Sequence, residues 1–533
     1  MHPIYSMKSS LSSLVLLGLM ALLPVGCSKF LSQNPDDRTQ INDIESAKEL
    51  AVKSYMDYSF VPIFEIRSDN SVDKGSRANL AKIWHPDIFK FKEFATSSYQ
   101  DSPQGVWRAS FEAVAHINQV LYELQRIGAQ GEEADQVRGE VLVARAYAMY
   151  MLAQAFTIPY NPATAATDLG LPYPTTPENK LLQEYDRLNL KETYDLIVKD
   201  YEEGYKLVGD NYKAPKFHFN RQAAAAFGTR LYRTLHNWDR VIELGTAALG
   251  NDPLVYTRKI NQKGTPYQST YYDRRSIWSM ETEKCNFLVA VSVSGWTRDF
   301  NNRYGMTTRL MKYLQNGENF LGVGPAYSVF GSNEFVLNIP KFQEHFRVTN
   351  QATNTGYVNT QFVLFGGDEV LFNLAEAYAM KNEFAKTENL LQIFVSNFMK
   401  DYDSKNEKFK VTRQKIEEYY KNKVGKESPD PVHGINVNTF NPTFQYTPEQ
   451  EMYLRACMDM KRIAFFHEGM RWMDIRQYRM DVVHNVESEG GAKEEFIVLK
   501  GTDPRVAFQL PNNVIPYLPK NPGYESEIQP ITK

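Results

Sequence analysis

The sequence predicts a mainly α-helical protein, in which tetratricopeptide-like helical hairpins form a scaffold and a loop-rich layer with short strands covers it. Three observations support this class. Several long stretches carry apolar residues at helical spacing on one side. Two stretches repeat one hairpin pattern of small residues, an aromatic residue across a turn and a second apolar helix. Between these two stretches, residues 251–367 lose the helical period.

The first 26 residues have the pattern of a secretory signal. Lys8 precedes an apolar run over 14–23, which is too short to span a bilayer as a helix. Cys27 follows Gly26, where a bacterial lipoprotein signal places the residue to be acylated. We favour this interpretation over a conventional secretory cleavage with an incidental cysteine. Residues 27–43 are then the lipid anchor and a polar tether.

The remaining chain, 44–533, is expected to form a single unit. Apolar periodicity predicts helices over the ranges 44–60, 106–157, 187–249, 368–399 and 448–480. Asn189, with Glu192 three residues later, predicts a capping box at the start of one helix. Because these helices are apolar on one side only, each needs a partner.

The two hairpins have matching aromatic residues. Tyr232 and Trp238 flank the turn of the first hairpin, and Tyr378 and Phe384 flank that of the second with the same spacing. Small residues on the first helix and an aromatic across the turn are typical of tetratricopeptide-like repeats. Two copies are fewer than a free-standing solenoid needs, so the other helices are expected to supply further pairs.

The excursion 251–367 is the expected ligand-binding region, because a long non-helical segment on a helical scaffold commonly carries function. Within it, residues 287–294 alternate as a half-buried strand does and end at Gly295. A second insertion, about 401–446, is polar and is expected at the surface.

Composition and motifs exclude several functions. With 60 basic against 63 acidic residues the chain has no global basic field, which disfavours nucleic acid as a partner. Catalytic serine elbows, phosphate-binding loops and zinc peptidase motifs are missing from the sequence. Cys285 and Cys457 have no metal-binding spacing, and whether they pair stays open. We therefore expect no cofactor and no metal site, although a spatial pair of carboxylates for glycoside hydrolysis stays possible.

The last predicted helix carries a recognisable signature at Glu468, Gly469, Arg471, Asp474 and Ile475. This pattern resembles that of the RagB/SusD family of Bacteroidetes outer-membrane nutrient-binding lipoproteins. Other parts agree in order along the chain, from Arg67-Ser-Asp-Asn70 through the Trp238 hairpin to Asn521-Pro-Gly-Tyr524. One departure is Lys461-Arg462 with Ala464, where the family usually has further carboxylates, which is expected to weaken the local carboxylate network.

The resemblance implies a surface lipoprotein that covers a TonB-dependent (SusC-like) outer-membrane transporter and hands it a captured glycan. Peptide binding on the same scaffold is one alternative, and a protein-interaction scaffold and a glycoside hydrolase are two others. The protein would contact the membrane only through its lipid anchor.

Candidate ligand residues follow from the chemistry of sugars, whose apolar faces pack on aromatic rings and whose hydroxyls bond to planar polar groups. One wall is expected in the loop 65–84, and the other in the excursion, with Trp296 near the end of the predicted strand as the main ring. The candidates are Arg67, Asp69, Asn70, Trp84, Tyr271, Tyr272, Trp296, Arg298, Asn301 and Tyr327.

The signature residues Glu468, Gly469, Arg471 and Asp474 are assigned a structural role. Spacing of three on a helix places neighbours on one face, which favours an ion-pair cluster that holds the helix end over acid/base catalysis. Arg471 is expected to pair with either neighbouring carboxylate.

Overall fold

The computed structural model describes residues 41–75, 78, 81–178, 184–327, 329–331, 337–429, 433–437, 440–487 and 494–532. The expected signal segment 1–26, Cys27 and the tether as far as residue 40 lie outside these residues. From Asp43 onward the chain forms one compact unit.

Helices dominate this unit, and the predicted fold class is confirmed. The α-helices are α3 (Ile44–Ala51), α4 (Val61–Arg67), α5 (His85–Phe89), α6 (Pro103–Arg126), α7 (Glu132–Phe156), α8 (Leu190–Leu207), α9 (Arg221–Thr234), α10 (Trp238–Leu249), α11 (Tyr271–Trp278), α12 (Thr308–Gln315), α13 (Gly367–Met380), α14 (Phe384–Phe398), α15 (Arg413–Tyr420), α16 (Pro448–Ala464) and α17 (Met470–Tyr478).

The strands form small antiparallel sheets. The largest has the order β2 (Asn286–Val293), β7 (Thr355–Gly366) and β6 (Gln343–Asn350). A second three-stranded sheet joins β10 (Val482–Glu487), β11 (Glu494–Leu499) and β12 (Ile531–Thr532). Two-residue pairs make up the rest: β1 (Val72–Asp73) with β3 (Tyr304–Gly305), β4 (Phe330–Gly331) with β5 (Leu337–Asn338), and β8 (Ser428–Pro429) with β9 (Asn436–Val437).

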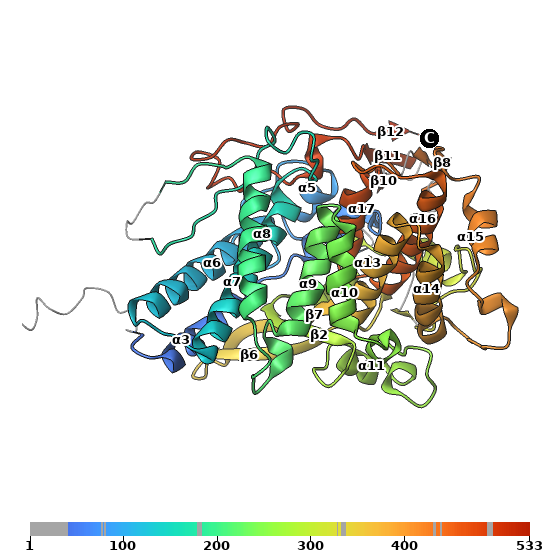
Figure 1. The fold of residues 1–533 in the computed structure, drawn as a ribbon. Coiled ribbons are helices and arrows are strands. Elements are labelled where there is room, and N and C mark those ends of the chain that lie inside the picture. The colour runs from blue at the N-terminus through green and yellow to red at the C-terminus, as the bar shows by residue number, and fades with distance from the viewer. Residues whose placement is uncertain are drawn as a thin grey trace, which may run out of the picture. The chain divides into compact units, whose positions relative to one another are not determined.

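The two predicted hairpins are α9–α10 and α13–α14, and they pack on each other through α10 and α13. Figure 1 shows the helical pairs following one another from α6 and α7 through α9 and α10 to α13 and α14. Small residues permit close packing between these helices: a Cβ at Gly245 of α10 would lie 3.3 Å from the Leu374 side chain of α13, and one at Gly228 of α9 would lie 2.0 Å from the Tyr201 hydroxyl of α8. The predicted capping box also forms, because Asn189 and Glu192 each accept the other's backbone N–H.

Two predicted helices differ from the structure. The helix expected over 44–60 ends at Ala51 and continues only as a 3-10 turn to Ser54. The helix expected over 448–480 is broken into α16 and α17, because His467 (φ 71°) and Gly469 (φ 72°) adopt left-handed backbone conformations. At Gly469 a Cβ would approach the backbone of Val61 to 3.0 Å, so glycine permits the close approach of α4.

Candidate functional site

Three aromatic rings gather at the start of α11. Tyr271 packs edge-on against Tyr272 and Phe330, with ring centroids 5.4 and 5.3 Å apart. Tyr272 is 75% exposed, and the Tyr271 hydroxyl accepts a hydrogen bond from Asn338 Nδ2 at 2.9 Å. We call Tyr271, Tyr272 and Phe330 the Tyr271 group. Its exposed ring offers an apolar face to a ligand, with an amide beside it.

The N-terminal cap of α11 fixes the two tyrosines in position. Thr270 accepts the backbone N–H of Asp273, and the Asp273 carboxylate accepts the hydroxyls of Ser269 (2.6 Å) and Thr270 (2.8 Å). These hydrogen bonds lower the pKa of Asp273. The cap therefore starts the helix at Tyr271 and sets the direction of both rings.

Charged groups lie close to the Tyr271 group. Arg298 donates two hydrogen bonds to Glu344, from Nε at 3.0 Å and from Nη2 at 2.6 Å, and the Thr297 hydroxyl donates a third at 2.5 Å. Arg275 lies 3.8 Å from the same carboxylate. The hydrogen bond from Arg298 is the main reason that the pKa of Glu344 is lowered. The result is a fixed carboxylate between two guanidinium groups, which suits hydroxyl recognition.

A small pocket connects these two features. Tyr271, Arg275 and Asn338 line it together with Trp296 and Thr297. The structure thus brings together the predicted Tyr271, Tyr272 and Arg298, and adds Phe330, Asn338, Arg275 and Glu344, which sequence reasoning missed. Glu344 lies in β6, where no sequence motif marks it as a ligand residue. Its contacts with Arg298, Thr297 and Arg275 in the folded protein identify it as part of the candidate site.

Trp296 lies beneath the surface and not on it. Its side chain is 4% exposed and packs with Phe342 and Phe362, and its Nε1 donates to the His467 carbonyl at 3.1 Å. The ring therefore offers almost no surface to a ligand, although it still lines part of the pocket described above. The expectation of an exposed ring is corrected: Trp296 begins the 3-10 helix η6 (Trp296–Asn301) directly after Gly295, and its ring packs into the cluster of Phe342 and Phe362.

The predicted wall from Arg67 to Asn70 is also buried. Arg67 donates to the Tyr524 hydroxyl at 3.1 Å, and its guanidinium lies 4.1 Å from the centre of the Phe508 ring. Asp69 accepts two hydrogen bonds from Arg471 at 2.8 and 2.7 Å, and Asn70 accepts one from Arg462. These residues join distant parts of the chain, which explains their polar character without a ligand.

The pKa of Asp69 follows from this pairing. Burial would raise it, but the charges of Arg462 and Arg471 hold it well below its ordinary value. Asp69 is therefore ionised, and both of its carboxylate oxygens are bonded to Arg471.

The predicted Trp84 is buried, but its neighbourhood reaches the excursion. Trp84 packs on Tyr99 at 5.4 Å, and Lys82 Nζ lies 4.7 Å from the centre of the Tyr99 ring. Two residues further, Asp101 accepts the backbone N–H of Gly295 at 2.8 Å. The segment that follows the expected wall 65–84 therefore contacts the excursion at Asp101 and Gly295, and the wall itself contacts it where β1 pairs with β3.

Asp101 has a raised pKa of about 7, mainly because burial disfavours its charge, and the neighbouring Asp299 adds to the effect. Its Oδ2 accepts from Gly295, whereas its buried Oδ1 has no hydrogen-bond partner. This environment favours the protonated carboxyl.

We expect Asp101→Asn to reduce the pH dependence of stability. The folded pKa exceeds the unfolded one, so the folded state binds more protons at this carboxyl, and the contribution of Asp101 to stability falls as pH rises from about 4 to about 7. The variant lacks this loss, which amounts to about 2 kcal/mol between about pH 5 and pH 7. Urea unfolding across this range measures the effect, with the exposed Asp195→Asn as the control. Equal pH slopes for wild type and Asp101→Asn would contradict the assignment.

Of the two remaining candidates, the structure describes the side chain of one. Tyr327 is buried, and its hydroxyl donates to the Ile463 carbonyl at 3.1 Å. Asn301 ends η6, but its side chain lies outside the described part of the structure.

The signature residues bond to other elements rather than to each other. Glu468 accepts from buried Lys341 at 2.7 Å, and Gly469 donates its N–H to Glu65 of α4 at 3.0 Å. Arg471 pairs with Asp69, and not with its neighbours on the helix. The expected ion-pair cluster within the helix is thus replaced by bonds that attach the helix break to α4 and to the excursion.

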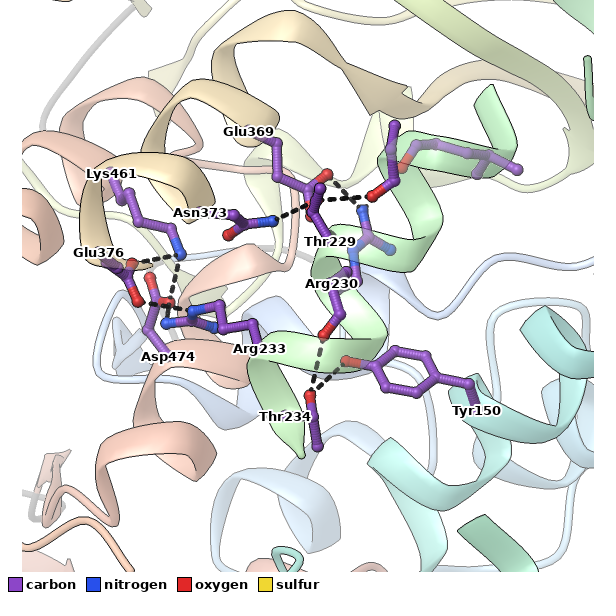
Figure 2. A network of polar contacts seen from close by, with 12 residues as sticks. Tyr150, Thr229, Arg230, Arg233, Thr234, Glu369, Asn373, Glu376, Lys461 and Asp474 are labelled. Carbon is purple, nitrogen blue, oxygen red and sulfur yellow. Dashed lines mark hydrogen bonds and ion pairs between the residues drawn. The ribbon is translucent and has the colours of Figure 1, made fainter. Parts of the chain in front are cut away.

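Asp474 belongs to a buried set of four charges, which Figure 2 shows between α9, α13, α16 and α17. Arg233 donates to Glu376 (2.7 Å) and Asp474 (2.8 Å), and Lys461 donates to the same two carboxylates at 3.1 and 2.8 Å. We call Arg233, Glu376, Lys461 and Asp474 the buried quartet. Lys461, noted as a departure in the sequence, is one of its two cations, and the second carboxylate comes from α13.

A second feature of the excursion is an open cleft of about 340 Å³. It is lined by Thr257, Lys259, Gln262, Thr265, Tyr267 and Glu283, among others. Tyr267 is buried and donates to Glu283 at 2.8 Å. Because this lining presents polar groups but no exposed ring, we favour the Tyr271 group as the ligand surface.

Two further features are missing from the described residues. Within them, no three His, Cys, Asp or Glu side chains are placed to hold a metal ion, and no helix is long and apolar enough to cross a membrane. Cys285 and Cys457 are both buried and free, which answers the question of their pairing.

Comparison with known proteins supports the predicted family. A family model described as "SusD-like_3: Starch-binding associating with outer membrane" matches residues 29–233. A search of curated proteins found no match.

Several solved structures, among them SusD superfamily proteins, share the fold over most of the chain. A putative sugar binding protein from Bacteroides vulgatus has 15% identity and a TM-score of 0.62, with 91% of this chain and all (100%) of that chain covered. A SusD superfamily protein from Bacteroides thetaiotaomicron has 13% identity and a TM-score of 0.59 over 90% of this chain and 100% of its own. Another from Bacteroides fragilis has 16% identity and a TM-score of 0.55, over 91% and 99%.

Proposed function

We propose that this chain is a SusD-like nutrient-binding protein of the outer membrane. The family model that matches residues 29–233 and the fold similarity over most of the chain support this proposal. It captures an oligosaccharide and delivers it to a partner TonB-dependent transporter of the SusC type. It is held by a lipid anchor on Cys27, faces the cell surface and catalyses no reaction.

The Tyr271 group is the observation that carries this proposal. An exposed Tyr272 ring stands at the edge of a group of three rings, near Asn338 and the Arg298–Glu344 pair. Flat rings cover the C–H face of a sugar, and a fixed amide, carboxylate and guanidinium bond its hydroxyls. The description of the matched family as starch-binding agrees with this chemistry.

Peptide binding at the same surface is the second candidate, because an amide and an Arg–Glu pair also suit peptide bonds. Calorimetric titration of residues 28–533 with panels of oligosaccharides and of peptides separates the two. Saturable heat with peptides alone would reject the glycan proposal, and shortening of a polysaccharide by the pure protein would reject the absence of catalysis. A TonB-dependent receptor encoded by the neighbouring gene would support the proposed transporter.

We expect Tyr272→Ala to weaken glycan binding about fivefold to tenfold, because a stacked ring contributes about 1 kcal/mol. The free energy of unfolding should change by less than about 0.5 kcal/mol, since the ring is exposed. Titration calorimetry and urea unfolding measure the two effects.

Tyr517 provides a matched control, because it is 74% exposed and lies in another part of the chain. Tyr517→Ala should leave the glycan affinity unchanged. Equal affinities of the Tyr272 and Tyr517 variants would remove Tyr272 from the site.

A further inference from the structure

The β6–β7 hairpin leaves the large sheet with apolar side chains uncovered. Phe346 and Val348 of β6 and Tyr357 of β7 are 53%, 41% and 56% exposed. From His345 to Asn350 every residue is exposed, so no other part of the described chain covers this strand. We call residues 345–358 the hairpin end.

Apolar groups lie on both faces of the hairpin end. Phe346 is paired with Val358, and Arg347 with Tyr357, so Phe346 and Tyr357 point to opposite faces of the hairpin. Arg347 is the last charged residue before Asp368. Beyond Arg347 the hairpin end is uncharged, and its tip over 349–355 is polar apart from Ala352, so it suits the hydrated headgroup layer, where no charge is desolvated.

The base of the hairpin end lies near Asp57, in the N-terminal part of the folded unit. The Val293 N–H of β2 donates to the Asp57 carbonyl at 2.7 Å, and Val293, Asn359 and His345 are successive partners across the sheet. Three such steps of about 5 Å place β6 about 15 Å from Asp57. The compact unit begins at Asp43, and the segment from Ser28 to Asn42 can span at most about 50 Å.

We propose that the hairpin end rests in the headgroup region of the membrane that carries the lipid anchor. This inference rests on the proposed anchoring through Cys27. Tyrosine is favoured at the membrane interface, and Arg347 can meet lipid phosphates. A few exposed apolar side chains bind a bilayer only weakly, so the membrane contact of the hairpin end depends on the tether that holds the protein at the surface. Together, the tether and the hairpin end would set the orientation of the folded unit over the membrane.

The experiment uses residues 28–533 with an N-terminal hexahistidine tag in place of the anchor. The vesicles contain phosphatidylcholine, phosphatidylglycerol and a nickel-chelating lipid. The tag binds this lipid and so replaces the acyl anchor on Cys27. Val348→Cys carries an environment-sensitive fluorophore, and Tyr517→Cys is the matched control. Cys285 and Cys457 are buried, and burial raises the pKa of both thiols, so labelling is confined to the introduced cysteine.

We expect a blue shift of the label at position 348 when vesicles are added, and none at position 517. Phe346→Ser in the Val348→Cys background should reduce the shift severalfold, with unchanged urea unfolding. The proposal is overturned if the label at position 348 shows no shift or if both positions shift equally. It is also overturned if the shift appears without vesicles, either when the protein concentration is raised or when the transporter is added. Glycan titration of the same samples tests the ligand proposal separately, and the membrane contact can fail while glycan binding stands.

Discussion

Glu376→Ala should lower the free energy of unfolding by about 3–5 kcal/mol, because it removes one carboxylate from the buried quartet. Glu376 is fully buried and accepts hydrogen bonds from Arg233, Lys461 and Tyr478, the last at 2.6 Å. Without it, two buried cations share the single carboxylate of Asp474. Urea or guanidinium unfolding at neutral pH measures the loss.

Glu243→Ala is the control for this variant. Glu243 also pairs with an arginine, Arg240, but its side chain is 65% exposed, so its removal should cost less than about 1 kcal/mol. Combining Glu376→Gln with Lys461→Met removes one charge of each sign and should recover part of the stability. A loss for Glu376→Ala no larger than that for Glu243→Ala would contradict the role of the quartet.

Trp296→Ala should also cost about 3–5 kcal/mol of folding free energy, because it leaves a cavity between Phe342 and Phe362. The carbonyl of His467 also loses the indole donor. Under native conditions the glycan affinity should fall less than in Tyr272→Ala, because the indole is covered by protein.

The two variants are therefore expected to have opposite effects on stability and on glycan binding. Trp296→Ala is expected to lose stability and retain binding, whereas Tyr272→Ala is expected to lose binding and retain stability. Calorimetric titration and chemical unfolding of both proteins provide the comparison. A large loss of affinity with unchanged stability in Trp296→Ala would restore the indole to the ligand surface.

The sequence predicted the scaffold because its determinants are local. The cap at Asn189 and Glu192 and the hairpin turns at Trp238 and Phe384 depend on residues within a few positions of each other. The break between α16 and α17 could not be predicted in this way, since it depends on α4, far away in the sequence.

The candidate site was predicted only in part for the same reason. Tyr271, Tyr272 and Arg298 were identified by residue type, but whether a ring is covered depends on distant partners. Trp296 is covered by Phe342 and Phe362, and Arg67 to Asn70 by the C-terminal third of the chain. Polar and aromatic residues outside helical periods can therefore mark long-range junctions, as Trp296, Arg67 and Asp69 do.

The contacts of α4 also affect the order in which the protein can fold. Glu65 accepts the N–H groups of His467 and Gly469 at 3.0 Å each, and Arg67 bonds to Tyr524. A chain that emerges N-terminus first thus cannot complete its core until its last segment is available. Such non-local closure slows folding and leaves apolar helix faces uncovered meanwhile. We expect C-terminal truncation before Met470 to yield aggregation-prone chains rather than a smaller stable domain.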